Sequence, residues 1–190
     1  FIILGSARSG SNLLSHMLRS HQNIHMFGEI FNFQSVSPAA LQAIFSDPRK
    51  YLEGMLTRKY PRDIIALGFK IFYNQMTAEQ VDCRFYSTYS IDRTDVSMEE
   101  ASQIDRLKRY IDDHFDAAAV KERISDLWSY LQENKCLKVV HLRRKNRLEQ
   151  YLSIRIAWQS NQWIARKSDQ QPLPRLKPIP LDYNSCLQFF

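Results

Sequence analysis

A short loop near the start of the chain has the composition of an anion-binding site. Residues 5–10 begin and end with glycine and contain one cation, Arg8, and a helical pattern starts at Ser11. A glycine-flanked turn before a helix directs several backbone N–H groups, together with the positive end of the helix dipole, at one point. The expected ligand is a phosphate or a related oxyanion. The residues predicted to hold it are Arg8, Ser9, Gly10, Ser11 and Asn12.

This loop differs from the nucleotide-binding loop of kinases and NTPases. Gly5 and Gly10 have the outer spacing of that Walker A pattern. However, Ser11 replaces its lysine, and Asn12 replaces the hydroxyl residue that binds Mg²⁺. Arg8 supplies positive charge inside the loop, where it could lie against the oxygens of a phospho-anhydride. A P-loop kinase or NTPase is the first alternative, and Mg²⁺-dependent ATP turnover would identify it.

Two ionisable residues, Glu29 and Lys70, are candidates for the same site. Glu29 follows a short strand pattern at residues 24–27, and Lys70 interrupts a longer one at residues 64–73. A right-handed β-α-β crossover brings the ends of the first two strands to one edge of the sheet, which places Glu29 beside Arg8. Glu29 is either a general base for an acceptor hydroxyl, or a surface residue or ion-pair partner of Arg8. Lys70 either extends to an edge of the sheet or meets the bound anion.

A second candidate anion site follows the strand pattern at residues 136–142. Arg143 and Arg144 come directly after this strand, and Ser153 lies on the helix that begins next. The planar fork of an arginine fits a phosphate group, and a hydroxyl farther along the following helix can reach the same anion. Either arginine, together with Ser153, is therefore a candidate for holding a phosphate. A solvated basic helix start is the alternative.

These segments resemble the sulfotransferases that use 3′-phosphoadenosine-5′-phosphosulfate (PAPS). Residues 8–14, Arg-Ser-Gly-Ser-Asn-Leu-Leu, resemble their 5′-phosphosulfate loop, and Arg144 with Ser153 resembles their 3′-phosphate segment. Gly-Glu-Ile-Phe at residues 28–31 and Gly-Phe-Lys-Ile-Phe at residues 68–72 are similar to segments of bacterial carbohydrate sulfotransferases of the trehalose and nodulation-factor kind.

The resemblance implies a mechanism and a substrate class. Arg8 and the loop would hold the 5′-phosphosulfate, while Arg144 and Ser153 would bind the 3′-phosphate. Glu29 would deprotonate an acceptor hydroxyl as the sulfuryl group passes to it in line, and Lys70 would meet the anion at the site. The mechanism requires no metal. The acceptor would be a hydroxyl of a carbohydrate or glycolipid.

The elements that must position these residues indicate an α/β protein. Strand patterns alternate with helical ones, which is typical of a three-layer fold of P-loop type, with a mostly parallel central sheet flanked by helices. The strand patterns lie at residues 1–4, 24–27, 64–73 and 136–142, and helical patterns lie at 38–60 in two pieces, 104–115 and 120–131. A proline-containing loop at residues 173–181 is expected to cross the surface near the nucleotide or acceptor.

Apolar spacing also distinguishes one face in each of the two helices that follow the candidate anion sites. In the first helix it predicts one apolar face, formed by Leu13, Leu14, Met17 and Leu18. In the later helix it predicts an inward face formed by Leu148, Leu152 and Ile156.

Length and charge fit one domain with an anionic ligand. The 190 residues are expected to form a single domain, residues 1–190, that lacks short segments at its ends. A net charge of +6 suits a multiply anionic small molecule, and it also suits nucleic acid or a membrane surface. A non-catalytic polyanion- or RNA-binding module is therefore the second alternative, and it predicts binding that weakens steeply with salt. The preferred interpretation includes no nucleic-acid partner.

The remaining composition gives expectations about metal sites and location. Three widely separated cysteines support neither a disulfide framework nor a metal site, and the five histidines lack the spacing of metal ligands, so we expect no bound metal. No apolar run approaches the roughly 20 residues of a membrane span. The expected location is the cytoplasm of a bacterium, with peripheral association at a membrane surface left open.

Overall fold

Four parallel strands form the centre of the protein. The computed structural model describes residues 1–33, 35–82, 98–160 and 162–163. The strands are β1 (Ile2–Gly5), β2 (Ile24–Met26), β3 (Ala66–Phe72) and β4 (Val139–Leu142). Their order across the sheet is β2-β3-β1-β4, and every pairing is parallel. The predicted α/β fold with a parallel central sheet is therefore confirmed.

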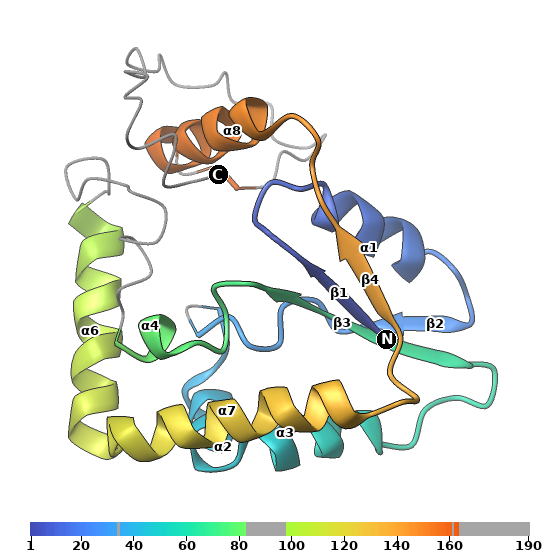
Figure 1. Ribbon diagram of the computed structural model, residues 1–190, viewed down its shortest axis with the longest axis horizontal. Helices are drawn as coiled ribbons and strands as arrows, with labels where there is room; N and C mark the ends of the chain where they lie inside the picture. The colour runs from blue at the N-terminus through green and yellow to red at the C-terminus, as the bar shows by residue number, and fades with distance from the viewer. Residues whose placement is uncertain (34, 83–97, 161, 164–190) are drawn as a thin grey trace.

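The sheet register fixes which residues of neighbouring strands lie side by side. Ile3 of β1 is level with Lys70 of β3 and Val140 of β4. Gly5, the last residue of β1, is level with Phe72 and Leu142. The segments that follow these three strands therefore leave the sheet at one edge. This edge lies toward α8 in Figure 1.

Helices flank the sheet, and local sequence signals mark where several of them begin. The helices are α1 (Ser11–Arg19), α2 (Pro38–Ser46), α3 (Pro48–Leu56), α4 (Ala78–Val81), α6 (Met98–His114), α7 (Ala117–Glu133) and α8 (Arg147–Ser160). Proline is the first residue of α2 and of α3, where its missing N–H costs nothing. Ser37 and Asp47 cap these two helices by accepting hydrogen bonds from backbone N–H groups.

The main hydrophobic core lies between the sheet and the layer formed by α2, α3 and α7. Ile2, Phe69 and Ile71 project from the strands into this core. Phe45 of α2 and Leu127 of α7 meet them from the helical side, and both side chains are fully buried. In Figure 1, α3 and α7 run below the sheet and α1 lies above it. The packed helices hold the strands in fixed positions. The segments that follow the strands at the sheet edge therefore start from fixed positions.

The inward face predicted for α8 is wrong, and the apolar face of α1 is largely exposed. In α1, Leu13 and Met17 are 68% and 62% exposed, while Ser11 and Ser15 are buried. The inward face of α1 is therefore lined by small polar side chains, and these apolar residues lie outside. In α8, Leu148 and Ile156 are exposed, and the buried residues are Gln150, Tyr151, Ile154, Arg155, Ala157 and Trp158. The inner face of α8 meets polar backbone of the loop after β1, and this contact selects a polar residue such as Gln150.

Two further predictions concern the proline-containing loop and the absence of a membrane span. The proline-containing loop expected at residues 173–181 lies outside the described residues. Among the helices that are described, none combines the length and the apolar character that crossing a membrane would demand.

Candidate functional site

The loop between β1 and α1 forms one wall of the candidate site. A Cβ atom at Gly5 would lie only 2.8 Å from the carbonyl oxygen of Leu142, so only glycine permits β4 to pass this close. Arg8 and Gly10 both have positive φ angles, 60° and 92°, which turn the chain sharply into the helix. A Cβ at Gly10 would meet nothing within 4 Å. Gly10 is also exposed, so within the described part of the chain an anion can approach this turn at the amino end of α1.

The side chain of Arg8 connects this loop to the end of α8. Its Nε donates a hydrogen bond to Ser153 Oγ at 2.8 Å, and its Nη1 donates to the carbonyl oxygen of Trp163 at 2.5 Å. Gln150, which is completely buried, donates from Nε2 to the carbonyl oxygen of Ala7 at 2.7 Å. The loop and α8 are thus held together at two points, and Ser153 lies directly beside the predicted anion loop.

Arg144 lies at the same place, whereas Arg143 does not contact the loop in the described part of the chain. Nη1 of Arg144 donates to the carbonyl oxygen of Arg8 at 3.4 Å, and Nη2 forms an ion pair with Glu149 at 2.9 Å. Arg143 is exposed, and Arg144 is half-buried. Of the two arginines that the sequence left as alternatives, Arg144 is the one that lies beside Arg8 and Ser153.

The two arginines make this region electropositive. Burial lowers the pKa of Arg8 from its ordinary value, and the neighbouring charge of Arg144 lowers it further. Arginine nevertheless stays protonated in proteins, so the effect is a cost of holding two cations together. An anion bound between them would offset that cost. The electrostatics of Arg8 and Arg144 therefore favour a phosphate or sulfate group at this position.

Lys70 and Glu29 form a second cluster on the other side of the loop. Nζ of Lys70 lies 2.7 Å from Glu29 Oε1 and also donates to Asn12 Oδ1 in the first turn of α1. Lys70 is 3% exposed, so it does not extend to an edge of the sheet. The ion-pair partner of Glu29 is Lys70, which corrects the alternative that placed Glu29 on Arg8. Asn12 joins this cluster to the anion loop.

Two amide side chains that the sequence analysis missed complete the environment of Glu29. Gln75 donates from Nε2 to Glu29 Oε2 at 2.9 Å, and Asn32 donates from Nδ2 to the same oxygen at 3.0 Å. Gln75 lies three residues after the end of β3 and is 3% exposed. A polar residue in the segment just after a buried strand was a usable signal for Gln75. Nothing in the sequence connects Gln75 with Glu29, because the two residues meet only in the folded chain.

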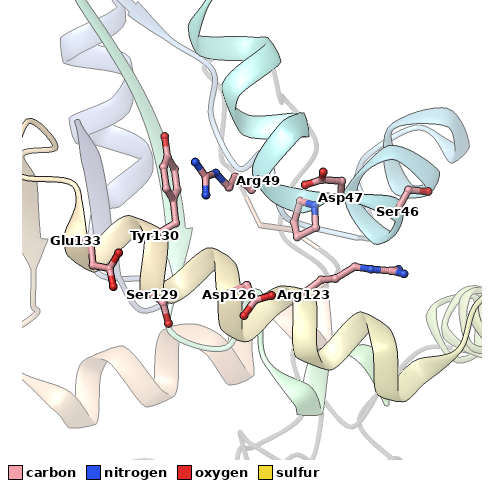
Figure 2. Close-up of a pocket in the computed structure, with 9 residues that line it drawn as sticks. Ser46, Asp47, Arg49, Arg123, Asp126, Ser129, Tyr130 and Glu133 are labelled. Atoms are coloured by element: carbon pink, nitrogen blue, oxygen red, sulfur yellow. The ribbon is translucent and has the colours of Figure 1, made fainter.

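A cavity of about 460 Å³ lies elsewhere, between the junction of α2 and α3 and one side of α7 (Figure 2). Both signs of charge occur in its lining, which includes the basic residues Arg49 and Arg123 and the acidic residues Asp126 and Glu133. The guanidinium of Arg49 lies 4.3 Å from the centre of the Tyr130 ring. None of the residues that the sequence predicted for the site lines this cavity. It is separate from the anion loop.

The loop has features that suit a ligand rich in anionic oxygens. Ser9 Oγ is buried and has no hydrogen-bond partner among the residues that the structure describes. A buried hydroxyl without a partner is costly, and rotation about χ1 would allow it to bond to a ligand oxygen. Open space at Gly10 and the paired cations of Arg8 and Arg144 provide room and charge for such a group.

Comparison with known proteins identifies the chain. A family model described as "Sulfotransferase family" matches residues 1–168. The match includes the loop at residues 5–10, the Glu29–Lys70 cluster and the Arg144–Ser153 segment. No curated protein and no solved structure matches. Because the model spans most of the 190 residues, and because the matched part contains both candidate anion-binding segments, the chain belongs to the sulfotransferase family.

Proposed function

We propose that this protein transfers the sulfuryl group of PAPS to a hydroxyl group of a carbohydrate or glycolipid. Sulfotransferases generally take the sulfuryl group from PAPS. The observation that supports this donor most strongly is the hydrogen bond from Arg8 to Ser153, with Arg144 beside it. The two predicted anion-binding segments are therefore close enough for one adenosine derivative to contact both.

The loop after β1 would hold the 5′-phosphosulfate. Backbone N–H groups at the amino end of α1, with the hydroxyls of Ser9 and Ser11 and the amide of Asn12, would contact its oxygens. The guanidinium of Arg8 would stabilise the negative charge that develops on the leaving phosphate. Ser11 is buried at the first position of α1, so its backbone N–H is among those without a partner inside the helix.

Arg144 and Ser153 would bind the 3′-phosphate, which distinguishes PAPS from ATP. The hydroxyl of Ser153 accepts from Arg8, and its own proton is available for donation to a phosphate oxygen. Arg144 forms an ion pair with Glu149, which is exposed. Exposed ion pairs contribute little free energy, so a phosphate could replace Glu149 as the partner of Arg144.

Glu29 would act as the general base. The acceptor hydroxyl would lose its proton to the carboxylate while its oxygen forms a bond to sulfur, and the bond from sulfur to the 5′-phosphate oxygen would break. Adenosine 3′,5′-bisphosphate would leave with the electron pair of that bond. Lys70 lies between Glu29 and Asn12, where its charge would assist the anionic donor. The carbohydrate or glycolipid acceptor rests on the resemblance of residues 28–31 and 68–72 to carbohydrate sulfotransferases.

Calorimetric titration with adenosine 3′,5′-bisphosphate, compared with ATP in the presence and absence of Mg²⁺, tests the donor. We expect the bisphosphate to bind at least about tenfold more tightly, because only it carries the 3′-phosphate that Arg144 would contact. Tighter binding of Mg²⁺-ATP would favour a kinase or NTPase. Equal, strongly salt-dependent binding of both nucleotides and of RNA would favour the polyanion-binding alternative.

A further inference from the structure

We propose that Gln75 and Asn32 are positioning residues for the carboxylate of Glu29, and that they leave Oε1 as the only oxygen that can take the acceptor proton. This inference rests on the proposed role of Glu29 as general base. It adds two residues to the site and assigns the proton transfer to one atom.

The orientation of the Gln75 amide is fixed by its surroundings. Its Oε1 accepts a hydrogen bond from the backbone N–H of Phe72 at 3.0 Å. Because that partner can only donate, the oxygen of the amide must face it, and Nε2 must therefore face Glu29. Gln75 is 3% exposed, so water cannot readily replace either partner. The donor that reaches Glu29 Oε2 is thus held rigidly by the end of β3.

Asn32, three residues after Glu29, donates to the same oxygen. Its Nδ2 donates to Glu29 Oε2 at 3.0 Å, and its backbone N–H donates to the carbonyl oxygen of Glu29 at 3.3 Å. A carboxylate oxygen has two lone-pair directions. With Gln75 and Asn32 both donating to Oε2, neither direction is left for a substrate hydroxyl.

Among the residues that the structure describes, Oε1 has one donor, Lys70 Nζ at 2.7 Å, and therefore keeps one lone-pair direction for a substrate. The side chain of Glu29 is 21% exposed, whereas Lys70 is 3% exposed. An acceptor can therefore approach the carboxylate, but it cannot approach from the side that Lys70 covers. In the transfer step the acceptor proton would pass to Oε1, which yields the neutral acid, while the new oxygen–sulfur bond forms and the bond from sulfur to the phosphate oxygen breaks.

The charged groups near this carboxylate come from two elements. Lys70 of β3 is in direct contact, and Arg19 of α1 lies close to Gly28, with its Nη2 donating to the carbonyl oxygen of Met26 at 3.1 Å. Neither cation replaces the two amides, because neither contacts Oε2 in the described structure. Loss of an amide donor would therefore destabilise the ionised carboxylate.

Gln80 provides a matched control for Gln75. It is also a buried glutamine, 8% exposed, and it lies five positions later. Its Oε1 accepts from the backbone N–H of Met76, and its Nε2 donates to the carbonyl oxygen of Phe31 at 3.1 Å. The two glutamines thus bridge backbone in similar ways, but only Gln75 contacts Glu29. A purely structural role would make their variants behave alike.

The test compares sulfuryl transfer from PAPS, and binding of adenosine 3′,5′-bisphosphate, in matched variants. In Gln75→Met, we expect kcat to fall by about tenfold or more, because the hydrogen bond that holds Oε2 is lost, while the affinity for the bisphosphate stays as in the wild type. Gln75→Glu, which keeps an acceptor for Phe72 but places a second carboxylate beside Glu29, should lower kcat at least as much. In the Glu29→Gln background, Gln75→Met should lower kcat no further, because the amide acts through that carboxylate. Gln80→Met should leave kcat and affinity unchanged.

Unchanged kcat in both Gln75 variants, equal losses in the Gln75 and Gln80 variants, or a further loss in the Glu29→Gln background would overturn the positioning role. Asn32→Ala offers a third measurement should Gln75→Met fail to fold, and it should also lower kcat. The proposed function is judged separately, by nucleotide binding and by turnover of Glu29→Gln. Normal turnover in that variant would reject Glu29 as the base.

Discussion

Arg8 and Ser153 lie 145 positions apart in the chain, yet Nε of the arginine donates a hydrogen bond to the serine hydroxyl at 2.8 Å. This contact joins the loop that follows β1 to the helix that follows β4. Because β1 and β4 are neighbouring parallel strands, their carboxyl ends deliver these two segments to one edge of the sheet. The proposed donor carries phosphate groups on both the 5′ and the 3′ carbon of its ribose, which would allow it to contact both segments.

Arg144→Ala should weaken binding of adenosine 3′,5′-bisphosphate by about tenfold or more, because a charge-assisted hydrogen bond to the 3′-phosphate is lost. Binding of ATP should change little. Arg143→Ala is the matched control, since it removes an adjacent but exposed arginine, and it should affect neither ligand. Calorimetry on the three proteins measures both affinities. An equal loss for the two nucleotides would remove Arg144 from the 3′-phosphate site.

Glu29→Gln should lower turnover by about 100-fold or more and leave binding of adenosine 3′,5′-bisphosphate intact. The substitution keeps the shape of the side chain but removes the group that accepts the proton. Release of the bisphosphate from PAPS, followed with trehalose and with methyl glycosides as acceptors, measures the rate. If the variant matches the wild type, the base is a different residue.

Arg8→Ala should reduce both nucleotide affinity and the thermal stabilisation that the nucleotide provides. A ligand present at about 100 times its Kd raises the free energy of unfolding by roughly 2.7 kcal/mol. At the same ligand concentration, the free energy of unfolding of Arg8→Ala should rise much less. Arg49→Ala changes an arginine that lines the separate cavity. The nucleotide should stabilise this variant as much as it stabilises the wild type. Because Arg8 stays charged, the effect should not vary between about pH 6 and 9. An undiminished Tm shift in Arg8→Ala would argue against the loop as the anion site.

Lys70→Met should lower the free energy of unfolding by about 3 kcal/mol, because the substitution removes the cation that pairs with the carboxylate of Glu29. The double variant Lys70→Met with Glu29→Gln should recover a large part of that loss. Urea denaturation of the two single variants and the double variant gives the coupling energy. Independent, additive effects would show that the ion pair contributes little.

Gly5→Ala should destabilise the protein and weaken nucleotide binding, since the new Cβ would lie 2.8 Å from the Leu142 carbonyl oxygen and force β1 and β4 apart. Gly54→Ala is the contrasting change. Gly54 lies within α3 and has open space around its Cβ position, so alanine should stabilise the helix by about 0.5–1 kcal/mol. Thermal unfolding of both variants tests the pair, and a neutral Gly5→Ala would contradict the tight contact described here.

The sheet and the location of the candidate site could be predicted from the sequence because both follow from general rules. Buried strands of a parallel sheet are recognisable as apolar runs, and their carboxyl ends meet at one edge. Glu29 and the segment with Arg143 and Arg144 could therefore be predicted to lie at that edge without coordinates, whereas Lys70 and the choice between the two arginines were left open. Their partners could not. The contact of Glu29 with Gln75 depends on the path of the chain after β3, which no local pattern describes.

The buried faces of α1 and α8 could not be predicted for a different reason. Apolar spacing identifies the inward face only where a helix packs on a hydrophobic core. The inner face of α8 instead meets loop backbone, through Gln150 and the carbonyl oxygen of Ala7, and the inner face of α1 is lined by Ser11 and Ser15. Leu13, Met17, Leu148 and Ile156 are accordingly exposed.

The central place of β1 has a consequence for biogenesis. β1 is made first, but its neighbours β3 and β4 are made much later, and the pairing with β4 requires residues 139–142. Parallel pairings between strands that are distant in sequence form slowly. The conformational entropy of the long intervening chain is lost before the contacts between the strands can stabilise the structure. A nascent polypeptide therefore carries the anion loop without Arg144 and Ser153 until those residues have been made. Nucleotide affinity should emerge only after β4 and α8 have been synthesised, in a single step.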